Sequence, residues 1–197
     1  MDELFEPACA EEQGFPAMLV RHARDMRKWA MLDSAPVIIE ATKDHIVATF
    51  ENIVLMVYER EALPQSATPF ARALDAVIRQ FPERAGILTV VADNAPVPSS
   101  EARQLLVGAM RTKGQGLKAS AVCFEGTGFS AAAARGVIVG ISMLVKPSFP
   151  HKVFGSLNDA ATWLSAALPK PVTAPRSIIR AIEIARGDIT SIPFRAR

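Results

Sequence analysis

Two adjacent serines, Ser99 and Ser100, lie where the sequence predicts the start of a helix. A strand-like run over 86–92 comes before them, and Asp93 and Asn94 open the connecting loop. The first turn of a helix has amide N–H groups without intrahelical partners, and the helix dipole favours negative charge there. We therefore take these four polar residues as a candidate site for phosphorylation or for contact with a partner protein. The simpler alternative is that a serine only caps the helix.

A single charge, Arg135, interrupts the apolar run that predicts a helix over 129–145. A charge among apolar residues must find a partner or reach water. Glu125 or Asp93 would provide the partner, in which case Arg135 and Glu125 form a candidate ligand contact or ion pair. Alternatively, the Arg135 side chain extends along its own apolar stem to the surface. The turn 125–128 is glycine-rich but has neither pattern of a nucleotide-binding loop, so it predicts a tight strand-to-helix turn.

The residue types that most often carry catalysis or hold metals are scattered along the chain. His22, His45 and His151 have no cysteine or carboxylate at the spacing of metal ligands. The pattern Gly-X-Ser-X-Gly of a nucleophilic serine does not occur. The two cysteines, Cys9 and Cys123, stand in a composition that suits a reducing cytosol, so we expect no disulfide. We accordingly expect no enzyme, no metal and no cofactor.

The chain has 197 residues, of which 50% are hydrophobic, and a formal net charge of +2. That composition is typical of a globular cytoplasmic protein and gives no reason to expect nucleic acid as a partner. No uncharged apolar run reaches the roughly 20 residues of a transmembrane helix. A predicted amphipathic helix over 15–32 would pack on the domain or on a partner, or would lie on an anionic membrane surface.

Two runs rich in β-branched residues, 45–50 and 53–58, are joined by Glu51-Asn52, which predicts a hairpin. A shorter strand-like run over 37–41 precedes them. The elements that follow are helix 64–80, strand 86–92, helix 99–113, strand 117–124, helix 129–145, strand 153–154, helix 156–168 and helix 176–186. The residues that we expect to face inward are Leu105, Leu106, Val107 and Met110 in helix 99–113, and Ile178, Ile179 and Ile182 in helix 176–186.

Strands separated by helices of about ten residues or more imply right-handed crossovers and a mainly parallel sheet. The opening hairpin adds an antiparallel pair. The sequence therefore predicts an α/β fold whose mixed, mainly parallel sheet has four to six strands, with helices packed beside it. Charge and composition divide the chain into an N-terminal appendage (1–35, a mobile start plus the amphipathic helix), an α/β domain (36–168), and a linker with a C-terminal helix or tail (169–197). Gly136 and Gly140, four residues apart, would allow close helix approach to the sheet or to a second copy in a homodimer.

Three sequence segments carry a family resemblance, together with the order hairpin, helix, strand, helix, strand, helix, strand, helix. The segments are Gly86 to Asp93 with Pro96 to Glu101, Ala121 to Ser130 leading into 131–140, and Phe149 to Phe154 followed by Asn158 to Leu164. Over 44–168 the chain resembles the STAS-like fold of anti-sigma-factor antagonists. It looks most like the uncharacterised STAS-like proteins of myxobacteria and related bacteria.

In the antagonist family a phosphorylatable serine begins the helix after a central strand, usually within an Asp-Ser-Gly-like motif. Ser99 or Ser100 falls at that place, where the chain reads Val97-Pro98-Ser99-Ser100-Glu101. The resemblance implies protein–protein regulation, by a non-enzymatic cytoplasmic regulatory or scaffold domain that binds a partner protein and is modulated at Ser99 or Ser100. The alternative is a carrier of a small molecule or lipid, with an apolar pocket near Arg135.

Overall fold

The computed structural model describes residues 35–93, 95–96, 98–113, 116–126, 148–170 and 173–190. The predicted helices over 15–32 and 129–145 lie outside these ranges, as do Asn94 and Arg135. The strands are β1 (Val37–Ala41), β2 (His45–Phe50), β3 (Ile53–Tyr58), β4 (Ala85–Val91), β5 (Leu117–Phe124) and β6 (His151–Phe154). The helices are η1 (Pro64–Ser66, a 3₁₀ turn), α2 (Ala67–Gln80), α3 (Ser100–Lys113), α5 (Leu157–Ala167) and α6 (Pro175–Thr190).

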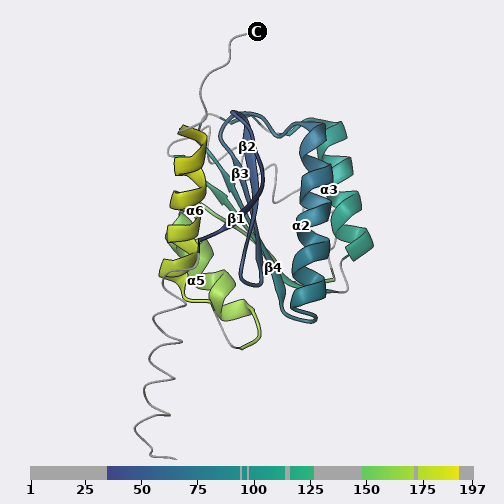
Figure 1. The fold of residues 1–197 in the computed structure, drawn as a ribbon, viewed down its shortest axis with the longest axis vertical. Coiled ribbons are helices and arrows are strands. Elements are labelled where there is room, and N and C mark those ends of the chain that lie inside the picture. The colour runs from purple at the N-terminus through teal and green to yellow at the C-terminus, as the bar shows by residue number, and fades with distance from the viewer. Residues whose placement is uncertain are drawn as a thin grey trace, which may run out of the picture. The chain divides into compact units, whose positions relative to one another are not determined.

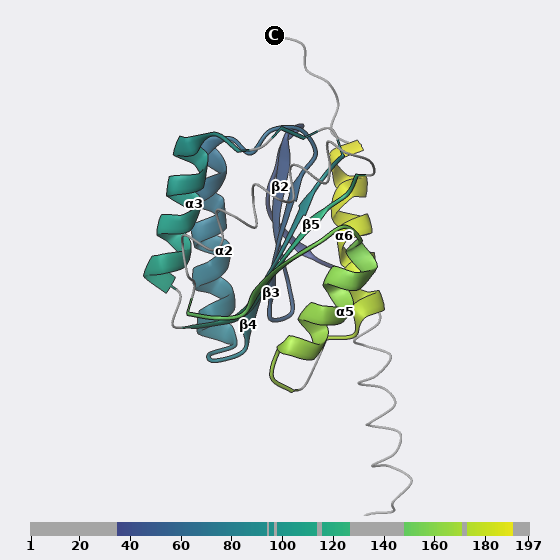
Figure 2. The same cartoon turned by 180° about the vertical axis from the view of Figure 1, so that it is seen from behind.

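The six strands form one sheet in the order of the sequence, β1-β2-β3-β4-β5-β6. The pairs β1–β2 and β2–β3 are antiparallel, and the strands from β3 to β6 run parallel. Helices α2 and α3 cover one face of the sheet, and α5 and α6 cover the other (Figure 1; Figure 2 shows the same arrangement from behind). The predicted α/β class, the mixed sheet and the opening hairpin are therefore confirmed.

The β2–β3 hairpin has the bounds that the sequence predicts. Its register runs without a break from the pair His45–Tyr58 to the pair Phe50–Ile53. β-Branched and aromatic side chains suit such a buried, pleated pair because they pack well against their cross-strand neighbours. The turn is tight enough that Glu51 has a φ of 50°, in the left-handed region. A two-residue hairpin connection commonly requires that backbone conformation.

Each face of the sheet carries an apolar core. Successive residues of a strand point to opposite faces. Leu55 and Val57 of β3 therefore join the core beneath α5 and α6, whereas Val54 and Met56 join the core beneath α2 and α3. Because β3 is covered on both sides, its sequence reads as a continuous apolar run and not as an alternating one.

Helix α3 confirms the predicted helix over 99–113, but not all of its predicted inward face. Leu106 and Met110 are half-buried against the core beneath α2 and α3. Leu105 is instead 45% exposed, so its predicted inward orientation is wrong. Successive residues of an α-helix point about 100° apart, so three apolar residues in a row cannot all face one side.

Helix α6 confirms the helix predicted over 176–186, and its apolar stripe packs on the sheet. Ile178, Ala181, Ile182 and Ala185 are buried in the core that α5 and α6 share with the strands. Their spacing of three and four residues defines one helix face. Among the described residues, no helix combines the length and the apolar character needed to cross a membrane.

A buried polar contact holds the segment before α6 against the β2–β3 turn. The hydroxyl of Thr173 contacts the carboxylate of Glu51 and lies 3.0 Å from the side-chain oxygen of Asn52. The side-chain amide of Asn52 in turn donates to the carbonyl of Arg84 at 2.6 Å, and the Ser165 hydroxyl donates to the carbonyl of Thr173 at 2.7 Å. The polar groups buried beneath this segment therefore have partners, as buried polar groups need for stability.

Candidate functional site

The carboxyl ends of three parallel strands, β3, β4 and β5, lie at one edge of the sheet. Tyr58, Val91 and Phe124, the last residues of these strands, stand in register. Backbone pairing continues one residue further: the N–H of Ala92 donates to the carbonyl of Tyr58, and that of Glu125 to the carbonyl of Val91, both at 2.9 Å. In open α/β sheets, binding sites usually lie at this edge. Functional groups are therefore expected at this edge.

One arginine of α6, Arg186, joins two glutamates at this edge. Its Nε donates to Glu59, the residue after β3, at 2.7 Å. Its two terminal nitrogens donate to the two carboxylate oxygens of Glu125, the residue after β5, at 2.9 and 2.6 Å. Because β4 lies between β3 and β5, the guanidinium spans the end of β4. All three side chains are half-buried, with 27% of Arg186 and 30% of each glutamate exposed.

These contacts keep the guanidinium charged. Burial alone would lower the pKa of Arg186, but hydrogen bonds with Glu125 and Glu59 and the charges of both carboxylates outweigh burial and raise that pKa above its ordinary value. A bidentate arginine–carboxylate pair also fixes geometry, because the planar guanidinium matches the two oxygens. The cluster therefore fastens the end of α6 to the ends of β3 and β5.

The sequence offered Arg135 as a partner for Glu125, and the structure shows Arg186 in contact with that carboxylate. Arg135 lies outside the described ranges, so the carrier alternative gains no support from the described contacts. The sequence did contain one signal for Arg186. It follows Ile182 by four residues and so extends the docking face of the predicted last helix.

The predicted serine site lies at the start of α3. Ser99 is the N-cap: its side-chain oxygen accepts the N–H of Ala102 at 3.1 Å, and its carbonyl accepts the N–H of Arg103 at 3.0 Å. Ser99 and Ser100 are both exposed, and Glu101 follows in the first turn. Capping by Ser99 is therefore observed. Capping does not prevent modification of a hydroxyl that solvent can reach.

Asp93 is exposed just after β4, whereas Asn94 lies outside the described ranges. The chain turns there, since the N–H of Ala95 donates to the carbonyl of Ala92 at 3.1 Å. The loop and α3 belong to the face that α2 covers, whereas Arg186 comes from α6 on the opposite face (Figure 2). The described candidates thus form two groups, an ion cluster on one side and an exposed helix start on the other.

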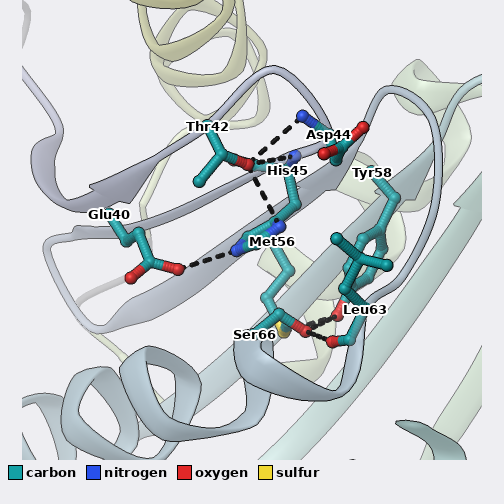
Figure 3. A network of polar contacts seen from close by, with 8 residues as sticks. All are labelled: Glu40, Thr42, Asp44, His45, Met56, Tyr58, Leu63 and Ser66. Atoms are coloured by element: carbon teal, nitrogen blue, oxygen red, sulfur yellow. Dashed lines mark hydrogen bonds and ion pairs between the residues drawn. The ribbon is translucent and has the colours of Figure 1, made fainter. Parts of the chain in front are cut away.

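A further polar network, which the sequence did not indicate, surrounds the buried His45 at the β1–β2 turn (Figure 3). His45 Nε2 lies 2.8 Å from Glu40 Oε1, and Nδ1 lies 3.2 Å from Thr42 Oγ1. An ionised carboxylate only accepts hydrogen bonds, so Nε2 carries a proton toward Glu40. Thr42 Oγ1 also accepts the backbone N–H groups of Asp44 and His45, at 3.2 and 3.0 Å.

The order hydroxyl, imidazole and carboxylate is the order found in nucleophilic catalysis. Here the Thr42 hydroxyl already accepts two backbone N–H groups of the turn and lies 3.1 Å from the carbonyl of His45. Only 1% of the His45 side chain is exposed. These contacts close the turn and satisfy a buried imidazole, and they give nucleophilic catalysis no support.

Tyr58 lies beside this network, with its ring centroid 6.3 Å from that of His45 (Figure 3). The Tyr58 and Ser66 hydroxyls lie 3.3 Å apart, and the Ser66 hydroxyl also contacts the carbonyl of Leu63 at 2.7 Å. Burial raises the pKa of Tyr58 to about 12, although the Ser66 contact acts in the opposite direction. Tyr58 is therefore a neutral, structural side chain at physiological pH.

Within the described ranges, no three or more histidine, cysteine, aspartate and glutamate side chains lie close enough to hold a metal ion. Comparisons of the chain with models of known protein families, with curated proteins and with solved structures found no match. The resemblance to STAS-like domains stays a prediction.

Proposed function

We propose that this protein is a non-enzymatic, cytoplasmic regulatory or scaffold domain that binds a partner protein through the loop 93–98 and the start of α3. The observation that carries the proposal is the exposure of Ser99 and Ser100 at a capped helix N-terminus. That helix begins after the central strand β4, at the edge of the sheet where α/β domains usually bind. Loops held by a rigid sheet are well suited to recognition, and Asp93 adds an exposed charge to this one.

Phosphorylation at either serine would alter this surface strongly. A phosphate adds about −1.5 to −2 charges at neutral pH. Near Ser99 or Ser100 it would meet the amide groups of the first turn and the positive end of the helix dipole, whereas Glu101 would repel it. A phosphate would therefore change the charge of this surface, and with it the affinity for a partner protein. The STAS-like resemblance supports the same regulation.

Crosslinked affinity purification from the native host tests the proposal, with the wild type compared with Ser99→Asn and Ser100→Ala. Asparagine caps helices as well as serine does, so Ser99→Asn removes the hydroxyl while α3 keeps its cap. The matched control is Ser156→Asn. Ser156 is the N-cap of α5 and accepts the N–H of Asp159 at 3.4 Å, so this variant makes the same change at another helix.

A stoichiometric partner that Ser99→Asn or Ser100→Ala weakens or strengthens, and that Ser156→Asn leaves unchanged, would support the proposal. Absence of any stoichiometric partner from native cells would contradict it. Intact-mass measurement tests separately whether Ser99 or Ser100 is phosphorylated. A single phosphate that disappears in one serine variant locates the modification, whereas unmodified protein under several growth conditions argues against phosphorylation.

A further inference from the structure

The outward face of α3 carries a stripe of side chains that the described part of the fold leaves exposed. The exposed residues of this stripe are Glu101, Gln104, Leu105, Gly108, Arg111 and Thr112. Separations of three, four and seven residues place them on one side of the helix. The other side, with Ala102 and Leu106, faces the domain core. Among the described residues nothing covers this stripe, so it can contact another molecule.

Gly108, in the middle of the stripe, has no packing explanation among the described residues. Glycine in a helix interior is less stable than alanine, so its presence needs a reason. Close packing explains two other glycines. An added Cβ would come within 2.9 Å of Leu168 at Gly86 and within 2.6 Å of Ile78 at Gly116. At Gly108 an added Cβ would meet no atom within 4 Å. A bare backbone at the surface would instead let another helix approach closely.

Leu105 lies three residues before Gly108 and is one of three exposed large hydrophobic residues in the described part of the chain. The other two, Val37 and Ile39, belong to β1. An exposed apolar side chain beside a position without a side chain makes the stripe complementary to a copy of itself. Helices pack in this way, with the side chain of one entering a gap on the other.

We infer that α3 pairs antiparallel with α3 of a second copy, about a two-fold axis that passes between Leu105 and Gly108. Such a contact is isologous, so each residue that meets another is met by it in return. Leu105 of each copy then packs on Gly108 of the other. The same arrangement brings Glu101 of each copy close to Arg111 of the other, twice by symmetry.

Charge complementarity favours a second copy as the occupant of this stripe. Glu101 lies at its start and Arg111 near its end, so antiparallel pairing matches opposite charges, whereas parallel pairing would set like charges side by side. The Thr112 hydroxyl of the stripe also has a partner within its own helix, because it donates to the Gly108 carbonyl at 2.9 Å. Removal of water from the stripe would therefore leave that hydroxyl with its partner.

This pairing goes beyond the proposed function and does not depend on it, since partner binding uses the loop 93–98 and the hydroxyls at the helix start. One helix–helix contact buries less than the roughly 800 Å² per subunit of a standard interface. We therefore expect a weak dimer that forms as concentration rises. Its charge pairs lie at the surface, so added salt should weaken it further.

Sedimentation equilibrium of the full chain, from micromolar to near-millimolar concentration, tests the inference. Glu101→Arg and Arg111→Glu each set like charges face to face, and each should raise the dissociation constant about tenfold or more. The double variant Glu101→Arg/Arg111→Glu restores opposite charges and should recover most of the wild-type affinity. The matched control is Glu183→Arg, which makes the same charge change at an exposed position of α6 and should leave the constant unchanged.

A dimer that both single variants weaken and the double variant recovers would establish the antiparallel α3 contact. Monomer throughout the concentration range would overturn it, and so would a dimer indifferent to Glu101→Arg. Single variants that weaken the dimer without recovery in the double variant would also overturn the antiparallel register. Leu105→Ser provides a second check. It should abolish dimer formation and leave monomer unfolding nearly unchanged, because Leu105 lies outside the core.

Discussion

Arg186 donates two hydrogen bonds to Glu125, a residue 61 positions earlier in the chain, and a third to Glu59, 127 positions earlier. The apolar stripe of α6 brings the guanidinium to the carboxyl ends of β3 and β5. At the other end of the same helix, Thr173 is bonded to the β2–β3 turn through Asn52. Polar contacts thus fix both ends of α6, and its apolar face fixes the middle. We therefore treat α6 as part of the folded core.

Replacement of Arg186 by methionine would leave two half-buried carboxylates without their shared partner. Removal of one member of a fully buried pair costs about 3–5 kcal/mol, and exposed pairs contribute about 1 kcal/mol or less. With 30% of each glutamate exposed, we expect Arg186→Met to lower the free energy of unfolding by about 2 kcal/mol. Arg186→Lys keeps the charge but loses the bidentate geometry, so it should cost less.

Urea unfolding of both variants provides the measurement, with Arg180→Met as the control. Arg180 lies on the same helix but is exposed, so its replacement should change the free energy of unfolding by no more than about 0.5 kcal/mol. Equal stabilities of Arg186→Met and Arg180→Met would show that the ion cluster contributes nothing to the attachment of α6.

The hairpin was predictable because both of its causes are local. The runs 45–50 and 53–58 each have the composition of a strand, and the two residues between them permit only a tight turn. The partnership of Arg186 with Glu125 was not predictable in this way. It depends on where α6 docks, and that docking involves strands far away in the sequence.

The His45 network was also hidden from the sequence, although Glu40 and Thr42 lie within five residues of the histidine. If β1 alternated strictly, the alternation alone would tell which of its side chains lie on the same face of the sheet as His45. The β1–β2 register, however, shifts between Ile38 and Glu40. Such an irregularity changes the face on which the following residues lie, and nothing in the run 37–41 announces it.

Tyr58 is the only tyrosine of the chain, so the ultraviolet absorbance of ionised phenol reports on this residue alone. Burial raises its pKa from 10.0 to about 12. We expect the absorbance of the folded protein to change with a midpoint near that value, and that of the urea-unfolded protein to change near 10. A folded-state midpoint near 10 would mean that water reaches the hydroxyl.

The same pKa difference predicts a loss of stability in alkali. Between pH 10 and about pH 12 the unfolded chain releases the Tyr58 proton while the folded chain keeps it, so the unfolded state binds fewer protons. The free energy of unfolding therefore falls as pH rises through this window, by at most about 3 kcal/mol from this residue. Urea unfolding of wild type and Tyr58→Phe isolates that part. The variant should lose less stability than wild type, and parallel curves would contradict the linkage.

Ser99 should stabilise α3 because its side-chain oxygen caps the helix, a role that another capping residue can fill. Ser99→Ala removes the acceptor of the Ala102 N–H and should lower the free energy of unfolding by about 1 kcal/mol. Ser99→Asn should be nearly neutral, and Ser100→Ala should fall within about 0.5 kcal/mol of wild type. Thermal unfolding of the three variants checks this order. If Ser99→Asn were as unstable as Ser99→Ala, the asparagine would not be a clean replacement for the partner experiment.

Three glycines differ in the room that an added Cβ would find. Gly108 and Gly187 lie in helices where an added Cβ would meet no atom within 4 Å. In dilute protein, Gly108→Ala and Gly187→Ala should each raise the free energy of unfolding by about 0.5–1 kcal/mol, since alanine restricts the unfolded chain and favours helix. Gly116→Ala should lower it by about 1–3 kcal/mol, because its Cβ would come within 2.6 Å of Ile78.

Denaturant unfolding at low concentration measures the three alanine variants where copies of the chain are apart. If Gly187→Ala raises the free energy of unfolding and Gly108→Ala does not, the glycine at Gly108 already matters within a single copy. The outward stripe would then need another explanation. Equal gains at both positions would show that the folded monomer has no need of glycine at Gly108. The reason for that glycine would then lie outside the described contacts of the monomer, as the antiparallel pairing of α3 proposes.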